Sequence, residues 1–152
     1  MSSSYIFLVQ EPYLYNTKLS LKPRTCSTFT GSTEHARTVI YASKNLNIWP
    51  LAHLSHRDCT AVTTVINNRT TIIASIYLDY HLEVLQPWLE ALMEYRRHKG
   101  YAILLGIDSN SHSQLYGEET NTRGKAIEDF IANHRLNVHN ICLLYTSPSP
   151  RD

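Results

Sequence analysis

The chain has 152 residues, of which 43% are hydrophobic and 18% are charged, and its net charge is +1. This length suits one domain, and the composition excludes an intrinsically disordered chain. A charge so close to zero gives no reason by itself to expect nucleic-acid or membrane binding, so DNA binding would have to depend on local patches or on a metal ion. The three cysteines show neither metal-ligand nor disulfide spacing, which favours reduced thiols in an intracellular protein without a membrane partner.

The first half of the chain is rich in short β-type runs. Residues 13–34 are rich in Ser, Thr, Lys and Pro, which predicts a long loop region. Residues 67–69 separate two β-rich runs by a spacing typical of a hairpin. We therefore predict strands at four places: residues 5–10, 37–42, 60–66 and 70–78.

The second half of the chain changes to a helical period. Apolar residues at i, i+3, i+4 and i+7 from Leu85 predict a helix over about Glu83–His98, which Gly100 then ends. The run Tyr101–Ile107 predicts a central buried strand. Asn121 or Thr122 is expected to cap a second helix, and the order of elements predicts an α/β layered domain with sheets beneath outer helices.

Two acidic residues directly follow predicted buried strands. Glu11 follows the first apolar run, and Asp108 follows the last one. Loops at one edge of a rigid sheet are where catalytic groups gather, and a carboxylate there can bind a hard cation. Asn110 adds an amide that can donate to a phosphate oxygen, and His112 is a further candidate, although an Asp-x-Asn sequence also serves as ordinary turn chemistry.

Five segments in the same order resemble the endonuclease domains of non-LTR retrotransposons, within the endonuclease/exonuclease/phosphatase superfamily. They are distributed along residues 5 to 140. Each segment is weakly specific alone, but the ordered set is fairly specific. The segments are Gln10-Glu11-Pro12-Tyr13, Ser75-Ile76-Tyr77-Leu78, Leu105 to His112, Tyr116-Gly117 and Asn121-Thr122-Arg123-Gly124.

This resemblance implies a four-layered αββα sandwich that hydrolyses a phosphodiester, here in DNA, with Mg²⁺ or alternatively Mn²⁺. Glu11 would be the principal metal ligand, and Asp108 would orient or deprotonate the attacking water. Asn110 and Tyr77 would hydrogen-bond phosphate oxygens, and His112 would be peripheral. DNA is then the expected partner, in the nucleus, with no obligate protein partner.

The chain also departs from the family pattern. The family has an Asn on a strand before the Gln-Glu segment and a Ser-Asp-His segment near its end, and neither appears here. Residues 142–152 resemble a translated sequencing adapter, so we expect a partial domain over residues 1–141, lacking terminal strands, and a non-native tail. We therefore expect little or no nuclease activity, marginal stability and aggregation through open sheet edges.

Two other functions stay open at this point. The chain could belong to another phosphoesterase of the same superfamily, acting on RNA, inositol phosphates or sphingolipid. It could also be a catalytically dead fragment or a binding module. In that last case millimolar Mg²⁺ should not raise its melting temperature, because only a ligand that binds the folded state stabilises it.

Overall fold

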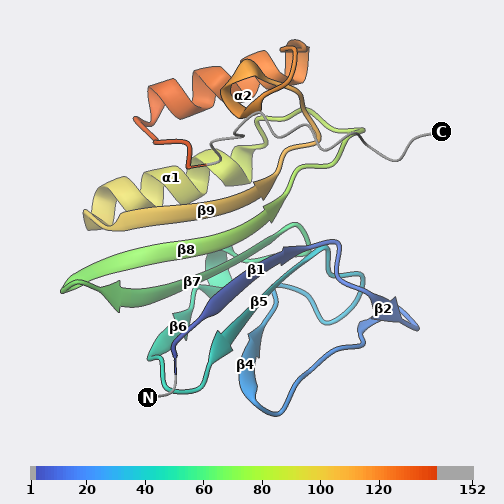
Figure 1. The fold of residues 1–152 in the computed structure, drawn as a ribbon, viewed down its shortest axis with the longest axis vertical. Coiled ribbons are helices and arrows are strands. Elements are labelled where there is room, and N and C mark those ends of the chain that lie inside the picture. Colours follow the sequence, from blue (N-terminus) through green and yellow to red (C-terminus); the bar gives the residue numbers. More distant parts are fainter. Residues whose placement is uncertain (1–2, 140–152) are drawn as a thin grey trace.

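The computed structural model describes residues 3–139, which form nine strands and two α-helices (Figure 1). The helices are α1 (Pro87–Lys99) and α2 (Thr122–Asn133), with 3-10 helices η1 (Ala52–Leu54) and η2 (Gln114–Tyr116). The strands are β1 (Ile6–Gln10), β2 (Leu14–Tyr15), β3 (Lys18–Leu19), β4 (Cys26–Phe29), β5 (Thr38–Ser43), β6 (Ile48–Pro50), β7 (Cys59–Ile66), β8 (Arg69–Tyr77) and β9 (Ala102–Asp108). The adapter-like tail lies outside the described residues.

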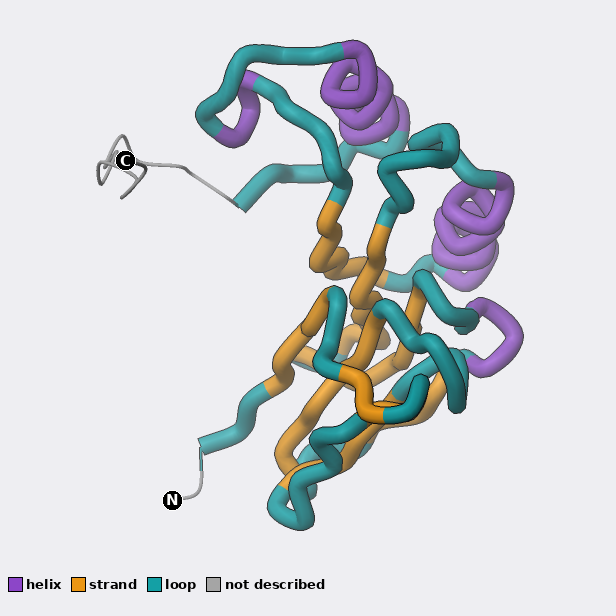
Figure 2. Tube along the Cα trace, turned by 90° about the vertical axis from the view of Figure 1, so that its right-hand side faces the viewer, coloured by secondary structure: helices purple, strands orange, loops and turns teal. Residues whose placement is uncertain are grey.

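The strands form two main sheets and a separate small hairpin. One sheet has the order β1-β5-β4 and is antiparallel, and the other has the order β6-β7-β8-β9. In the second sheet β8 and β9 are parallel, and α1 connects them. The hairpin consists of β2 and β3, which form a separate two-stranded sheet at one side of the molecule (Figures 1 and 2).

The two sheets pack face to face through a small apolar core. Ile40 of the first sheet and Val62 and Ile73 of the second are almost fully buried in one cluster. The contact is tightest at Gly106, where an added Cβ would lie 2.8 Å from the Leu8 Cδ1 atom. A side chain at position 106 would require Leu8 of the facing sheet to shift, so glycine suits this close approach of the two sheets.

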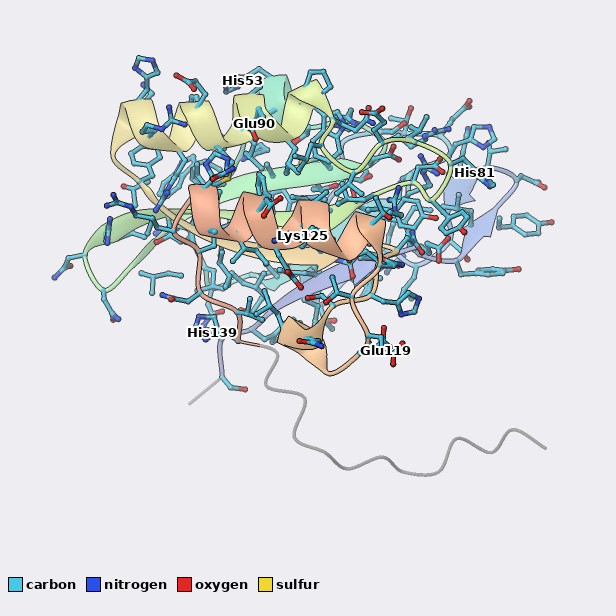
Figure 3. All side chains as sticks on the ribbon, turned by 90° about the horizontal axis from the view of Figure 1, so that it is seen from above. His53, His81, Glu90, Glu119, Lys125 and His139 are labelled. Atoms are coloured by element: carbon cyan, nitrogen blue, oxygen red, sulfur yellow. The ribbon has the colours of Figure 1, made fainter. Side chains whose placement is uncertain are left out.

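Both helices cover the outer face of the four-stranded sheet (Figure 1). Their buried residues Leu89, Leu92 and Phe130 share one core with the outward side chains of β7 and β8. The amphipathic pattern explains this placement, because the opposite helix surfaces carry polar residues such as Glu90 and Lys125 (Figure 3). Neither helix is long and apolar enough to span a bilayer, within residues 3–139.

Within residues 3–139, the β2–β3 hairpin and the loop after it pack against the outer face of the β1-β5-β4 sheet. Val39 and Tyr41 of β5 pack there against Leu19 of the hairpin. The Tyr41 hydroxyl also donates to the Leu21 carbonyl oxygen at 2.8 Å. The predicted α/β class is confirmed, while the second outer helical layer of an αββα sandwich stays a prediction.

Several element predictions need correction. The long loop predicted over residues 13–34 contains the β2–β3 hairpin and β4. The first helix begins at Pro87, four residues later than predicted, and Leu85 is 40% exposed before it. Proline explains the start, since its ring is compatible with the first helical position but not with the interior. The strand predicted to be central, β9, pairs only with β8 among the described residues.

Candidate active site

The carboxyl ends of β8 and β9 lie side by side because these two strands are parallel. In their register Tyr77 is the partner of Asp108, and the next residue, Leu78, donates its backbone N–H to the Asp108 carbonyl oxygen at 2.9 Å. The sheet therefore holds the aromatic ring and the carboxylate at one edge. The resemblance predicted that Tyr77 bonds a phosphate oxygen and that Asp108 orients or deprotonates the attacking water.

Gln10 brings the end of β1 to the same edge. Its side-chain amide nitrogen donates to the Ser75 hydroxyl at 2.9 Å and to the Gly106 carbonyl oxygen at 3.1 Å. The Ser75 hydroxyl in turn donates to the Val9 carbonyl oxygen at 2.9 Å. These bonds join the facing sheets two residues before Tyr77 and Asp108, so Glu11 follows β1 at the same end of the molecule as Asp108.

Glu11 occupies an unusual backbone conformation. Its φ is 49°, in the left-handed region that non-glycine residues seldom adopt, and its N–H donates to the Arg37 carbonyl oxygen at 2.9 Å. Glu11 is exposed, and within residues 3–139 no protein group forms a hydrogen bond or ion pair with its carboxylate. Strained residues that surrounding structure holds in place are common at functional sites.

Asn110 connects the ends of β8 and β9. Its backbone N–H donates to the Asp108 carboxylate at 3.2 Å, and its side-chain amide donates to the Leu78 carbonyl oxygen at 2.9 Å. Its φ of 46° turns the chain sharply after β9. One amide hydrogen and the amide oxygen of Asn110 are left for other partners.

Arg123, in the first turn of α2, holds the loops that follow the two parallel strands. Its guanidinium donates to the carbonyl oxygens of Asn110 at 3.0 Å, Leu82 at 2.6 Å and Asp79 at 3.1 Å. The next residue, Gly124, has no room for a side chain, because an added Cβ would lie 1.6 Å from the His112 carbonyl oxygen. The Asn121-Thr122-Arg123-Gly124 segment therefore holds the loops that follow β8 and β9 against α2.

Arg37 lies beside Glu11 and forms a network of ion pairs. Its guanidinium binds both carboxylate oxygens of Asp58, at 2.6 and 2.7 Å, and one oxygen of Asp79 at 2.7 Å. The same guanidinium lies over the Tyr77 ring, 4.6 Å from its centroid. The hydrogen bond from Arg37, with one from the His81 backbone, lowers the pKa of Asp79.

His112 lies farther along the loop and pairs with Glu118, and both side chains are exposed. The neighbouring Ser113 hydroxyl donates to the Glu128 carboxylate of α2 at 2.6 Å, and this bond lowers the pKa of Glu128. The loop is therefore held to α2 by its own residues. A peripheral role for His112 stays a prediction.

A metal ion at this edge would need few protein ligands. Across the described part of the chain, no group of three or more His, Cys, Asp or Glu residues could hold a metal. Mg²⁺ usually keeps several waters and binds one or two carboxylates together with substrate phosphate. The exposed, unpaired carboxylate of Glu11 fits that ligand pattern better than it fits a closed protein cage.

Sequence reasoning selected Glu11, Tyr77, Asp108 and Asn110, and the structure brings the segments that carry all four to one edge. It missed the roles of Arg37, Arg123 and Gln10. The last two lie within segments that resemble the retrotransposon endonucleases, so the resemblance contained a signal for them. Arg37 had no such signal, because its partners are distant in the sequence.

The described residues form a mixed α/β domain with two facing sheets. A solved structure described as the endonuclease domain of TRAS1, a telomere-specific non-LTR retrotransposon, matches with a TM-score of 0.69 and 20% identity. That match covers 90% of this chain and 62% of the TRAS1 chain. At this identity the similarity establishes the fold alone.

The sequence itself shows the family. A model of the family described as endonuclease-reverse transcriptase matches residues 71–149, which is more than half of the chain. The chain therefore belongs to the endonuclease-reverse transcriptase family. The matched region contains Tyr77, Asp108, Asn110 and Arg123. Comparison with curated proteins gives no match.

Proposed function

We propose that this chain carries the phosphodiester-cleaving site of a retrotransposon-type DNA endonuclease. The observation that supports this most directly is the Gln10 side chain, which bonds to Ser75 and Gly106 and so holds the Glu11 segment at the edge where Asp108 ends β9. The family match supports a nuclease, and DNA as substrate and a nuclear location belong to the proposal.

Each residue of the site has a separate task in this proposal. Glu11 would hold the metal ion, which supplies Lewis-acid stabilisation of charge on the phosphate when it is bound. Asp108 orients or deprotonates the attacking water. Asn110 offers its remaining amide hydrogen to a phosphate oxygen, and Tyr77 offers its hydroxyl. Arg37 restrains the Tyr77 ring by lying over it.

The metal assignment can be tested without relying on turnover, which matters because the chain spans 62% of the TRAS1 domain. Thermal melts of the whole chain are recorded with and without 10 mM Mg²⁺. A ligand at ten times its dissociation constant stabilises the folded state by about 1.4 kcal/mol. We expect the wild-type melting temperature to rise by a few degrees, and Glu11→Gln, which removes the proposed metal ligand, to lose most of that rise. Asp108→Asn, which removes the proposed water-orienting group, should keep more of the rise than Glu11→Gln does.

Glu94→Gln is the matched control, because Glu94 is an exposed carboxylate on α1. It should keep the full response to Mg²⁺. Equal responses in all four proteins would overturn the metal assignment. Nicking of supercoiled plasmid in Mg²⁺ that Glu11→Ala abolishes would support the endonuclease proposal and contradict the predicted inactivity of the chain.

A further inference from the structure

The residues that follow Glu11 form a positively charged surface. We call residues 13–24 the hairpin segment. It contains Lys18, Lys22 and Arg24 and no Asp or Glu. All three cations are exposed, and none of them takes part in an ion pair in the described structure. The hairpin segment is therefore locally cationic, although the net charge of the whole chain is only +1.

The same surface presents exposed aromatic rings. Tyr13 is 75% exposed and Tyr15 is 66% exposed, whereas Leu19 is buried against the sheet. In the hairpin register Tyr15 is the partner of Lys18, so the aromatic and the cationic side chain project from the same face of the hairpin. A ring beside a cation is the combination that binds bases and phosphates of a nucleic-acid strand.

The hairpin segment is also held in a fixed position. Asn16 and Thr17 have φ values of 48° and 66°, as both central residues of a type I′ turn require. The His35 N–H donates to the Thr17 carbonyl oxygen at 2.8 Å, and Tyr41 donates to the Leu21 carbonyl oxygen. A surface that is already ordered loses less entropy when it binds a ligand.

The hairpin segment lies next to the candidate active site. Figure 1 shows it extending from the side of the molecule to which the ends of β1, β8 and β9 point. His81, in the loop after β8, lies at that same end in Figure 3. Tyr15 is four residues from Glu11, so their Cα atoms are at most about 14 Å apart. At the rise of a stacked strand, about 3.4 Å per nucleotide, that distance is at most roughly four nucleotides.

We propose that the hairpin segment binds an unpaired stretch of DNA beside the phosphate that the active site holds. Lys18, Lys22 and Arg24 neutralise phosphates, and the Tyr15 ring stacks on a base. The base must be unpaired, because stacking within a duplex covers the base faces that a protein ring would need. This inference rests on the proposed DNA substrate, but it concerns binding and does not require cleavage.

The test measures DNA binding by fluorescence anisotropy in EDTA, with the whole chain and two labelled DNAs. One is a blunt duplex, and the other is the same duplex with a single-stranded extension. We expect tighter binding to the extended DNA. The triple variant Lys18→Ala, Lys22→Ala, Arg24→Ala should weaken that binding roughly tenfold or more and lower the salt slope by about 2, at about 0.7 for each lost phosphate contact.

Tyr15 supplies the second arm of the test. Tyr15→Ala should weaken binding to the extended DNA about tenfold and have little effect on the blunt duplex, whereas Tyr15→Phe keeps the stacking ring and should bind like the wild type. Lys44→Ala is the matched control for Lys18→Ala, because each substitution removes one exposed lysine. Lys44 is also exposed, but it follows β5 at the end of the sheet opposite to Gln10.

The outcomes separate this inference from the proposed cleavage. Glu11→Gln should bind the extended DNA in EDTA at least as tightly as the wild type, even though it loses the response to Mg²⁺. Hairpin variants that bind both DNAs like the wild type would overturn the inference. So would equal wild-type affinity for the two DNAs, or no measurable binding of either. Circular dichroism melts verify that each exposed substitution leaves the fold intact.

Discussion

Arg37 connects three segments that meet at one edge of the two sheets. Its fork-shaped guanidinium reaches Asp58 with two bonds, Asp79 with one, and the Tyr77 ring with its face. Lysine has the same charge but cannot make the two-bond contact. We expect Arg37→Lys to lower the free energy of unfolding by about 1.5 kcal/mol, the loss typical of one hydrogen bond to a charged group.

Urea unfolding checks this prediction through the midpoint, with the slope unchanged. Arg57→Lys is the control, because Arg57 is 51% exposed and lies 3.5 Å from Asp58 in a weaker contact. A midpoint shift no larger than that of the control would show that the Arg37 network does not stabilise the fold.

At the residue scale the sequence predicts strand ends well and long-range partners poorly. Glu11 and Asp108 could be found because each follows an apolar run. Arg37 could not, because Asp58 and Asp79 are 21 and 42 residues away from it. Only folding brings such partners together. Sequence patterns such as hydrophobic periodicity concern residues a few positions apart, so they cannot identify ion-pair partners this distant in the sequence.

At the element scale, α2 depends on a glycine that would ordinarily weaken a helix. Replacing glycine by alanine inside a helix normally stabilises it by roughly 0.5–1 kcal/mol. Gly124→Ala should instead destabilise the protein by about 1–3 kcal/mol, because the new Cβ would collide with the His112 carbonyl oxygen. Thermal melts compare this variant with the wild type.

Ala132→Gly is the control for helix propensity, since Ala132 is exposed on the same helix. It should destabilise by about 1 kcal/mol. If Gly124→Ala raised the melting temperature, the tight contact between α2 and the loop would be refuted.

The elements that the sequence predicted are the long ones with clear periodicity. The turn at Asn67 and Asn68 was predicted, and both residues have the positive φ that a two-residue hairpin needs. The turn at Asn16 and Thr17 has the same backbone property but joins strands of only two residues. Such short strands give no alternating pattern, so the hairpin segment appeared to be part of a loop.

At the scale of the whole molecule, His56 makes stability depend on pH. Its ring lies edge-on against Trp88, its Nδ1 atom accepts the Asp58 N–H at 3.2 Å, and burial lowers its pKa despite the opposing charge of Asp58. The folded state therefore favours the neutral ring, while the unfolded chain takes up a proton near pH 6.5. This contribution to stability is complete above about pH 6.5 and is lost as the pH falls below it.

We expect the melting temperature to be lower at pH 5.5 than at pH 7.5, and His56→Gln to reduce that difference. His98→Gln is the control, because the His98 side chain is 80% exposed on α1. If the melting temperature of His56→Gln changed with pH as much as that of the wild type, groups other than His56 would be responsible for the pH dependence.

The overall class of the fold followed from the order of elements, but the neighbours of each strand did not. The apolar runs of β1 and β9 suggested strands with partners on both sides, yet each pairs on one side only in the region that the structure describes. An apolar run carries no information about the edges of a strand, and on these two strands it also predicted more burial than the structure shows. Phe7 and Leu104 are 57% and 46% exposed on these two strands.

Gly106 shows how one position can serve two constraints. Its missing side chain admits Leu8 of the facing sheet, and its carbonyl oxygen accepts the hydrogen bond from Gln10. A larger residue at position 106 would require Leu8 to shift or to be replaced by a smaller residue, so we expect the two positions to covary in related chains. The glycine two residues before Asp108 would then reflect how closely the two sheets approach each other.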